Sequence, residues 1–238
     1  MSLKKTRMLT FILILLFLSG CRLSAFGGQV VIDWVDFIHF DGKEYNGIHS
    51  GVLADKSFIG NKIGTVKFKV ADNVKNPSYK IRDGDAAFHE KGTEIFQIKD
   101  HPHLIAVKDD RAINGYRVYF SRDDDIEYQW NFKDMPIEKV ERIEIYQTDS
   151  PAGNKLISKL TKSDDINSFL QLLVDSEENP NFQPTRGSGD PIFYEMFFYT
   201  DEPIAYKYYM QFDGETYYWS PWDTSILSDE IQTFIGGN

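Results

Sequence analysis

Hydrophobic and polar residues alternate with a period of two along the first half of the chain. Val31–Phe40 is rich in β-branched and aromatic residues and ends at Asp41-Gly42, a pair typical of a type I′ hairpin turn. Residues 64–70 alternate valine or phenylalanine with lysine or threonine, which predicts a half-buried strand. Because no helical period interrupts this pattern, residues 29–122 are predicted to form a β-rich domain. Its other strands are expected at 86–88, 94–98, 104–107 and 116–120.

The second half mixes strand and helix patterns. Apolar residues recur at helical spacing after Ser163, and further strands are expected at 143–146, 156–160, 193–200, 204–212 and 216–219. A short final helix is expected before Gly236-Gly237. We therefore expect an α+β domain at 137–238, joined to the β-rich domain by an acidic linker at 123–136. The predicted fold class is α+β, with an N-terminal all-β half followed by a C-terminal antiparallel sheet with two short helices.

Strand alternation assigns the two faces of the segment 204–212. Its inward face is expected to pack on the helix stripe, leaving Tyr209 on the opposite face. The inward residues are Tyr206, Tyr208, Met210 and Phe212, and the helix stripe is Ile166, Phe169, Leu170 and Leu173. The form F-D-G-x-x-Y occurs at 40–45 and again at 212–217. An internal repeat is one interpretation, and two hairpins with the same turn chemistry are the favoured one.

The N-terminus reads as a targeting segment. Lys4, Lys5 and Arg7 precede Met8–Leu18, an eleven-residue run that is apolar except for Thr10. Since a bilayer-spanning helix needs about 20 apolar residues, this run predicts a signal peptide over 1–20. A retained N-terminal anchor is the disfavoured alternative.

The residues that end this segment, Leu18-Ser19-Gly20-Cys21, resemble the lipobox of bacterial lipoproteins. The resemblance implies a diacylglyceryl group on the Cys21 sulfur, cleavage before Cys21, and a lipidated tether at 21–28. Each buried methylene of such acyl chains, for instance palmitate, contributes roughly 0.8 kcal/mol, so two chains anchor stably. The expected location is the extracytoplasmic face of the cell membrane.

Two further segments resemble those of uncharacterised lipoproteins of Gram-positive bacteria such as bacilli. They are Gly84-Asp85-Ala86-Ala87-Phe88, which leads to Lys91-Gly92-Thr93, and Asp213–Ser220. These motifs are structural, so the resemblance implies membrane attachment and transfers no catalytic residue.

Composition narrows the chemistry. The 238 residues carry 26 basic and 36 acidic side chains, a net charge of −10, so nucleic acid is not expected as a partner. Without residues 1–20, which include three basic residues and no acidic one, the net charge becomes −13. A single cysteine excludes an intrachain disulfide and a cysteine-rich zinc site. No nucleophile-elbow, P-loop or zinc-protease motif occurs, and no cofactor is expected.

Two polar clusters are candidate metal sites. His101 and His103, with His89, offer imidazoles, but exposed loop histidines are the favoured interpretation. The run Asp123–Asp125, with Asp109-Asp110, lacks the spacing of a calcium loop, so a solvated linker is favoured.

The exposed aromatic residues remain as candidates for contact with a partner. Tyr209 and Trp222 form the predicted interaction surface. The predicted function is a lipid-anchored extracytoplasmic lipoprotein that acts as a non-catalytic binding or interaction module for an envelope protein or polymer. The alternative is a cell-envelope hydrolase that uses carboxylates in a cleft between the two halves.

Overall fold

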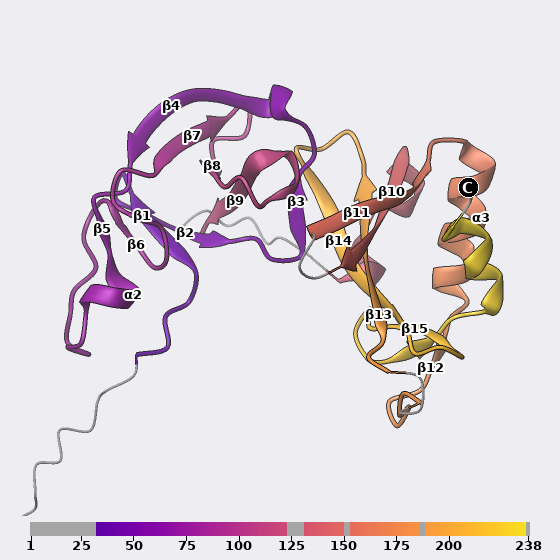
Figure 1. Ribbon diagram of the computed structural model, residues 1–238. Coiled ribbons are helices and arrows are strands. Elements are labelled where there is room, and N and C mark those ends of the chain that lie inside the picture. The colour runs from indigo at the N-terminus through magenta and orange to yellow at the C-terminus, as the bar shows by residue number, and fades with distance from the viewer. Residues whose placement is uncertain (1–31, 123–130, 150–152, 186–188, 237–238) are drawn as a thin grey trace, which may run out of the picture. The chain divides into compact units, whose positions relative to one another are not determined.

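The computed structural model describes residues 32–122, 131–149, 153–185 and 189–236 (Figure 1). Two units divide the chain: residues 1–33 with 74–79, and Trp34–Asn73 with Lys80–Asn238. All the described helices and strands belong to the second unit. The predicted signal peptide, the tether with Cys21, and residues 123–130 of the predicted linker lie outside the described residues. The predicted domain division at 123–136 stays a prediction.

The N-terminal half contains one curled eight-stranded sheet, here called sheet A. Its strand order is β4-β7-β8-β9-β2-β1-β6-β5, and among the described strand pairs only β5–β6 is parallel. Ile38, Ile95 and Tyr119 are fully buried in its core. The strands are β1 (Phe37–Phe40), β2 (Lys43–Gly47), β4 (Ile59–Thr65), β5 (Phe68–Lys69), β6 (Asp85–Ala86), β7 (Glu94–Ile98), β8 (Leu104–Lys108) and β9 (Tyr116–Ser121). The connections include η1 (Lys56–Phe58), η2 (Ile113–Gly115) and helix α2 (Val70–Asn73).

One predicted strand of this half is wrong, and two strands, β4 and a three-residue strand at Gly51–Leu53, have no predicted counterpart. The segment 64–70 is not a single strand, because β4 ends at Thr65, β5 spans two residues and α2 begins at Val70. Buried Val66 lies in the connection between β4 and β5, and buried Val70 begins α2. Strand β4 was not predicted because Gly60 and Gly64 interrupt its alternation of apolar and polar residues. Gly64 is required there, since the ring of Phe40 occupies the place where a Cβ would stand.

The C-terminal half contains an antiparallel sheet, here called sheet B. Its order is β11-β10-β13-β14-β15-β16-β12, and β3 (Gly51–Leu53) pairs with the start of β14. This architecture confirms the predicted fold class. The strands are β10 (Arg142–Asp149), β11 (Gly153–Leu160), β12 (Glu177–Glu178), β13 (Ile192–Tyr199), β14 (Ile204–Phe212), β15 (Tyr217–Trp219) and β16 (Ser225–Ile226).

Helix α3 (Ser163–Val174) covers one face of sheet B, here called the helix face (Figure 1). The predicted stripe of α3 and the predicted inward face of β14 lie in one core, which confirms the face assignment. Tyr209 lies on the other face and is 50% exposed. The final helix is a 3-10 helix, η5 (Asp229–Phe234), and not an α-helix. Ser228 caps it by accepting a hydrogen bond from the amide of Glu230.

The two F-D-G-x-x-Y segments form hairpins of different geometry. Phe40 pairs with Lys43 across the two-residue turn of Asp41 (φ 51°) and Gly42 (φ 74°), as the type I′ prediction requires. Phe212 instead pairs with Tyr217 across a four-residue loop. In that loop the Asp213 carboxylate accepts hydrogen bonds from backbone amides, including those at 215 and 216. Different loop lengths favour two hairpins over an internal repeat.

Candidate functional site

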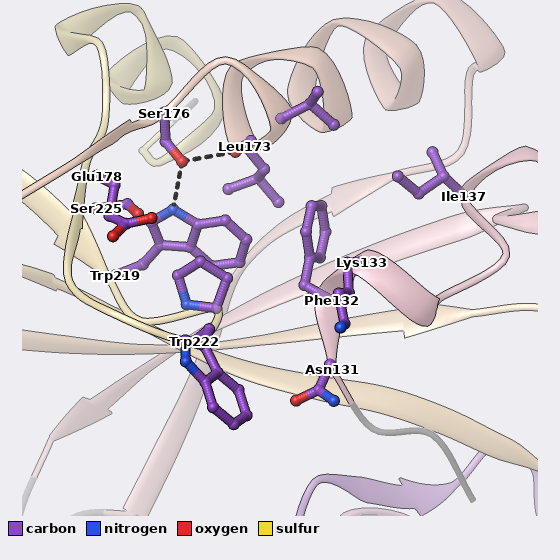
Figure 2. Close-up of a pocket in the computed structure, with 12 residues that line it drawn as sticks. Asn131, Phe132, Lys133, Ile137, Leu173, Ser176, Glu178, Trp219, Trp222 and Ser225 are labelled. Atoms are coloured by element: carbon purple, nitrogen blue, oxygen red, sulfur yellow. Dashed lines mark hydrogen bonds between the residues drawn. The ribbon is translucent and has the colours of Figure 1, made fainter.

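The turn between β15 and β16 places Trp222 on the surface beside a cavity of about 640 Å³ (Figure 2). Trp222 is 85% exposed, the largest exposure among the large hydrophobic side chains of the described residues. The cavity, here called the Trp222 pocket, lies on the helix face of sheet B. Its lining residues are Asn131, Phe132, Lys133, Ile137, Leu173, Val174, Ser176, Glu178, Trp219, Pro221, Trp222 and Ser225. Its volume is within the range of small-ligand sites, roughly 300–1,000 Å³.

Buried aromatic and aliphatic side chains form the floor of the Trp222 pocket. Trp219 is 1% exposed, and its ring meets Phe132 edge to face with centroids 4.8 Å apart. Leu173 reaches the floor from the end of α3. Phe132 comes from η3 (Phe132–Asp134), inside the predicted linker 123–136, and packs in the same core as α3. The floor is therefore part of the buried C-terminal core.

The polar atoms of the floor satisfy one another. The indole Nε1 of Trp219 donates to Ser176 Oγ at 3.0 Å, and Ser176 Oγ donates to the backbone oxygen of Leu173 at 2.7 Å (Figure 2). A ligand group that enters the pocket meets no spare donor on this indole. The floor accordingly favours an apolar group, because a buried polar group without a partner costs about 1–3 kcal/mol.

The rim of the Trp222 pocket is charged. Glu178, in strand β12, and Lys133, in η3, border the cavity from different sides and are exposed (Figure 2). Glu177 and Asp223 are exposed next to rim residues. Within the described residues, Glu177, Glu178 and Asp223 form no ion pair.

Comparison of the chain with protein-family models, with curated proteins and with solved structures finds no match. The geometry of the site is thus the basis for interpreting it.

Tyr209, the other predicted surface residue, does not join Trp222. It lies on the face of sheet B opposite α3 and borders a separate cavity of about 340 Å³, here called the polar pocket. The ammonium of Lys207 lies 4.7 Å from the centre of the Tyr209 ring. The two residues therefore belong to two different sites and do not form one surface.

Charged side chains line the polar pocket, and its carboxylates are held by cations. Glu195 accepts from Asn154 and pairs with Lys207 at 2.8 Å. Asp109 pairs with Arg111 and with Arg117, each at 3.3 Å. Burial alone would raise the pKa of Asp109, but hydrogen bonds from Arg111 and the charges of both arginines lower it below its ordinary value. A general acid needs a raised carboxyl pKa, so Asp109 does not support the hydrolase interpretation.

The three histidines considered as metal ligands are partly buried and not exposed as predicted, and His89 is engaged by another side chain. His89 Nε2 lies 2.5 Å from the hydroxyl of buried Tyr119, which donates to Asp36 at 3.0 Å. Burial lowers the pKa of His89 and raises that of Tyr119. His101 and His103 lie with ring centres 5.8 Å apart. No group of three or more potential ligands gathers among the residues the structure describes, and Asp123–Asp125 lie outside them.

In the part of the chain that the structure describes, no helix is long and apolar enough to cross a bilayer.

Proposed function

We propose that this chain is a lipid-anchored, non-catalytic binding module of the extracytoplasmic membrane surface, and that the Trp222 pocket holds its ligand. The observation that carries the proposal is an indole that is 85% exposed beside a cavity of about 640 Å³ with an apolar floor. Keeping a large aromatic side chain in water has no benefit for folding, whereas exposed tryptophans are frequent anchors in binding sites. The ligand is an envelope protein or polymer.

The lipid anchor rests on the lipobox-like segment ending in Cys21. Mass spectrometry of the mature N-terminus is expected to find an acylated cysteine, and Cys21→Ser is expected to release the chain from the membrane fraction. An unmodified thiol on a chain that retains Met8–Leu18 would contradict the anchor.

Site-specific photo-crosslinking on intact cells tests the ligand site. A benzophenone amino acid replaces Val174, which borders the pocket and is 52% exposed. The matched control carries the same group in place of Phe193, which is 44% exposed on the opposite face of sheet B. The proposal expects an adduct from position 174 that disappears in the Trp222→Ala background.

Three outcomes of the crosslinking experiment would contradict the proposal. The same adducts from both positions, or adducts that persist after Trp222→Ala, would show that the Trp222 pocket is not the ligand site. The absence of any adduct from position 174 would also contradict the proposal.

A further inference from the structure

Resting on the proposed function, a more specific ligand follows from three features of the Trp222 pocket. We infer that the pocket receives a large apolar side chain, aromatic by preference, from an extended basic peptide segment that pairs with the edge of β12. The features are the hydrogen-bonded apolar floor, the strand edge beside it that no described strand covers, and the acidic side chains at and next to β12 that form no ion pair among the described residues.

The floor selects the inserted group. Trp219 and Phe132 present ring surface, and the indole Nε1 of Trp219 is already bonded to Ser176. A sugar ring that entered the floor edge first would bring hydroxyl groups against this surface and leave them unpaired, which costs about 1–3 kcal/mol each. A phenyl side chain brings no polar group and makes edge-to-face contacts with the floor.

The neighbouring strand selects an extended peptide. Strand β12 is the last strand of sheet B and pairs only with β16 among the described residues, through Glu177–Ile226 and Glu178–Ser225. Glu178 also borders the Trp222 pocket. Open main-chain groups and a side-chain pocket therefore adjoin, which is the arrangement of strand-addition sites. Because β12 has two residues, the inserted side chain must supply most of the affinity.

The opposite edge of sheet B is protected against such pairing. The register of β11 against β10 shifts between Ile145 and Tyr146, which leaves an extra residue in β11. The same strand carries two lysines, Lys155 and Lys159. Bulges and lysines are common devices that prevent an edge strand from pairing with other chains. Strand β12 carries neither a bulge nor a lysine, but it is itself a very short edge strand with two charged side chains, so it can pair only with a short segment of opposite charge.

The charges beside β12 select a basic segment. Glu177, Glu178 and Asp223 are exposed and have no ion-pair partner within the described residues. Lys133, the basic residue among those lining the pocket, comes from η3 and not from the β12 side. The net charge of −10 adds a favourable field for a cationic ligand. Lysines flanking the inserted side chain would meet the three acids, and salt would weaken their contribution.

Fluorescence anisotropy with defined peptides tests this inference. The probe is fluorescein-labelled Lys-Lys-Phe-Lys-Lys-amide, titrated with the full chain purified from membranes in detergent. Replacing the probe's Phe by Ala, or its four Lys by Glu, is expected to weaken binding by about tenfold or more, as losing an interface anchor does. Methylating the backbone nitrogens beside its Phe removes strand hydrogen bonds and is expected to weaken binding severalfold.

Protein variants locate the site. Trp222→Ala is expected to weaken binding of the probe by about tenfold, whereas Tyr209→Ala, an exposed aromatic residue on the opposite face, should leave the affinity within about twofold. Glu178→Gln should weaken binding and reduce its dependence on salt. Equal losses from Trp222→Ala and Tyr209→Ala would overturn the inference.

The outcomes separate this inference from the proposed function. If an N-acetylglucosamine oligomer or dodecanoate binds in a Trp222-dependent manner and the peptide does not, the pocket is a ligand site and the peptide inference is wrong. If the methylated peptide binds as tightly as the parent, pairing with β12 is wrong. If none of these probes binds and the crosslink from position 174 is absent, both proposals are wrong.

Discussion

The two pockets of the C-terminal half differ in whether their charged and aromatic groups have partners within the chain. In the polar pocket each carboxylate is neutralised by the protein itself, as Glu195 is by Lys207 and Asp109 by two arginines. In the Trp222 pocket the floor is apolar, Glu178 on the rim forms no ion pair among the described residues, and a large indole stays in water. A ligand gains binding energy from charged or apolar groups that have no interaction partner within the chain. The pocket with more charged groups is therefore the weaker candidate for binding.

The largest expected effect separates the floor of the Trp222 pocket from its rim. Trp219→Ala should lower the free energy of unfolding by about 3–5 kcal/mol, because a buried tryptophan leaves a large cavity. Trp222→Ala should change it by less than about 0.5 kcal/mol, since the side chain is exposed. Denaturant unfolding of the two variants side by side measures both. Similar losses would show that Trp222 belongs to the core.

The next effect concerns the ion pair of the polar pocket. Glu195→Gln should lower the free energy of unfolding by about 2 kcal/mol, because it leaves the largely buried ammonium of Lys207 without its carboxylate. Adding Lys207→Met should recover part of the loss, which a double-mutant cycle would reveal. Additive losses in the cycle would show that the two side chains are not coupled. Binding of the peptide probe should be unaffected.

Lowering the pH should change the contribution of the polar pocket to the free energy of unfolding by about 1 kcal/mol or less, the usual size of one hydrogen bond. It should leave the contribution of the Trp222 pocket unchanged. Asp109 has a pKa below its ordinary value, so the unfolded chain binds a proton there at a higher pH than the folded chain does. The stability that Asp109 contributes is present above its ordinary pKa and is lost as the pH falls through the folded value. The difference in unfolding free energy between wild type and Asp109→Asn should therefore shrink between pH 6 and pH 3, about the span of this titration. The difference in unfolding free energy between wild type and Trp222→Ala should stay constant over the same pH range. A matching pH dependence for Trp222→Ala would contradict the assignment of this effect to Asp109.

More of the fold than of the candidate site could be predicted from the sequence. The period of α3 and the alternation of β14 each identify a buried face, since burial imposes a repeating pattern on a regular element. Strand β4 and η3 lack a readable pattern, because glycines interrupt the first and the second spans only three residues, Phe132–Asp134. The Trp222 pocket joins η3, α3 and the β15–β16 turn, and contacts between distant segments leave no period in the sequence. Trp222 itself was identifiable, whereas the floor beneath its rim was not.

The smallest expected effect tests whether Tyr209 has any role beyond its own strand. The Tyr209 ring faces the Lys207 ammonium at 4.7 Å, a contact worth about 0.5–1 kcal/mol at an exposed site. Tyr209→Ala should cost that amount and Tyr209→Phe almost nothing, because phenylalanine keeps the ring face that attracts the cation. Denaturant unfolding of both variants, with the Lys207→Met background as control, isolates the contact, since the cost of Tyr209→Ala should fall once the ammonium is gone. A loss from Tyr209→Phe would instead assign the contribution to the hydroxyl group. Weaker crosslinking from position 174 in either variant would show that the polar pocket takes part in binding, and the contrast between the two pockets would no longer hold.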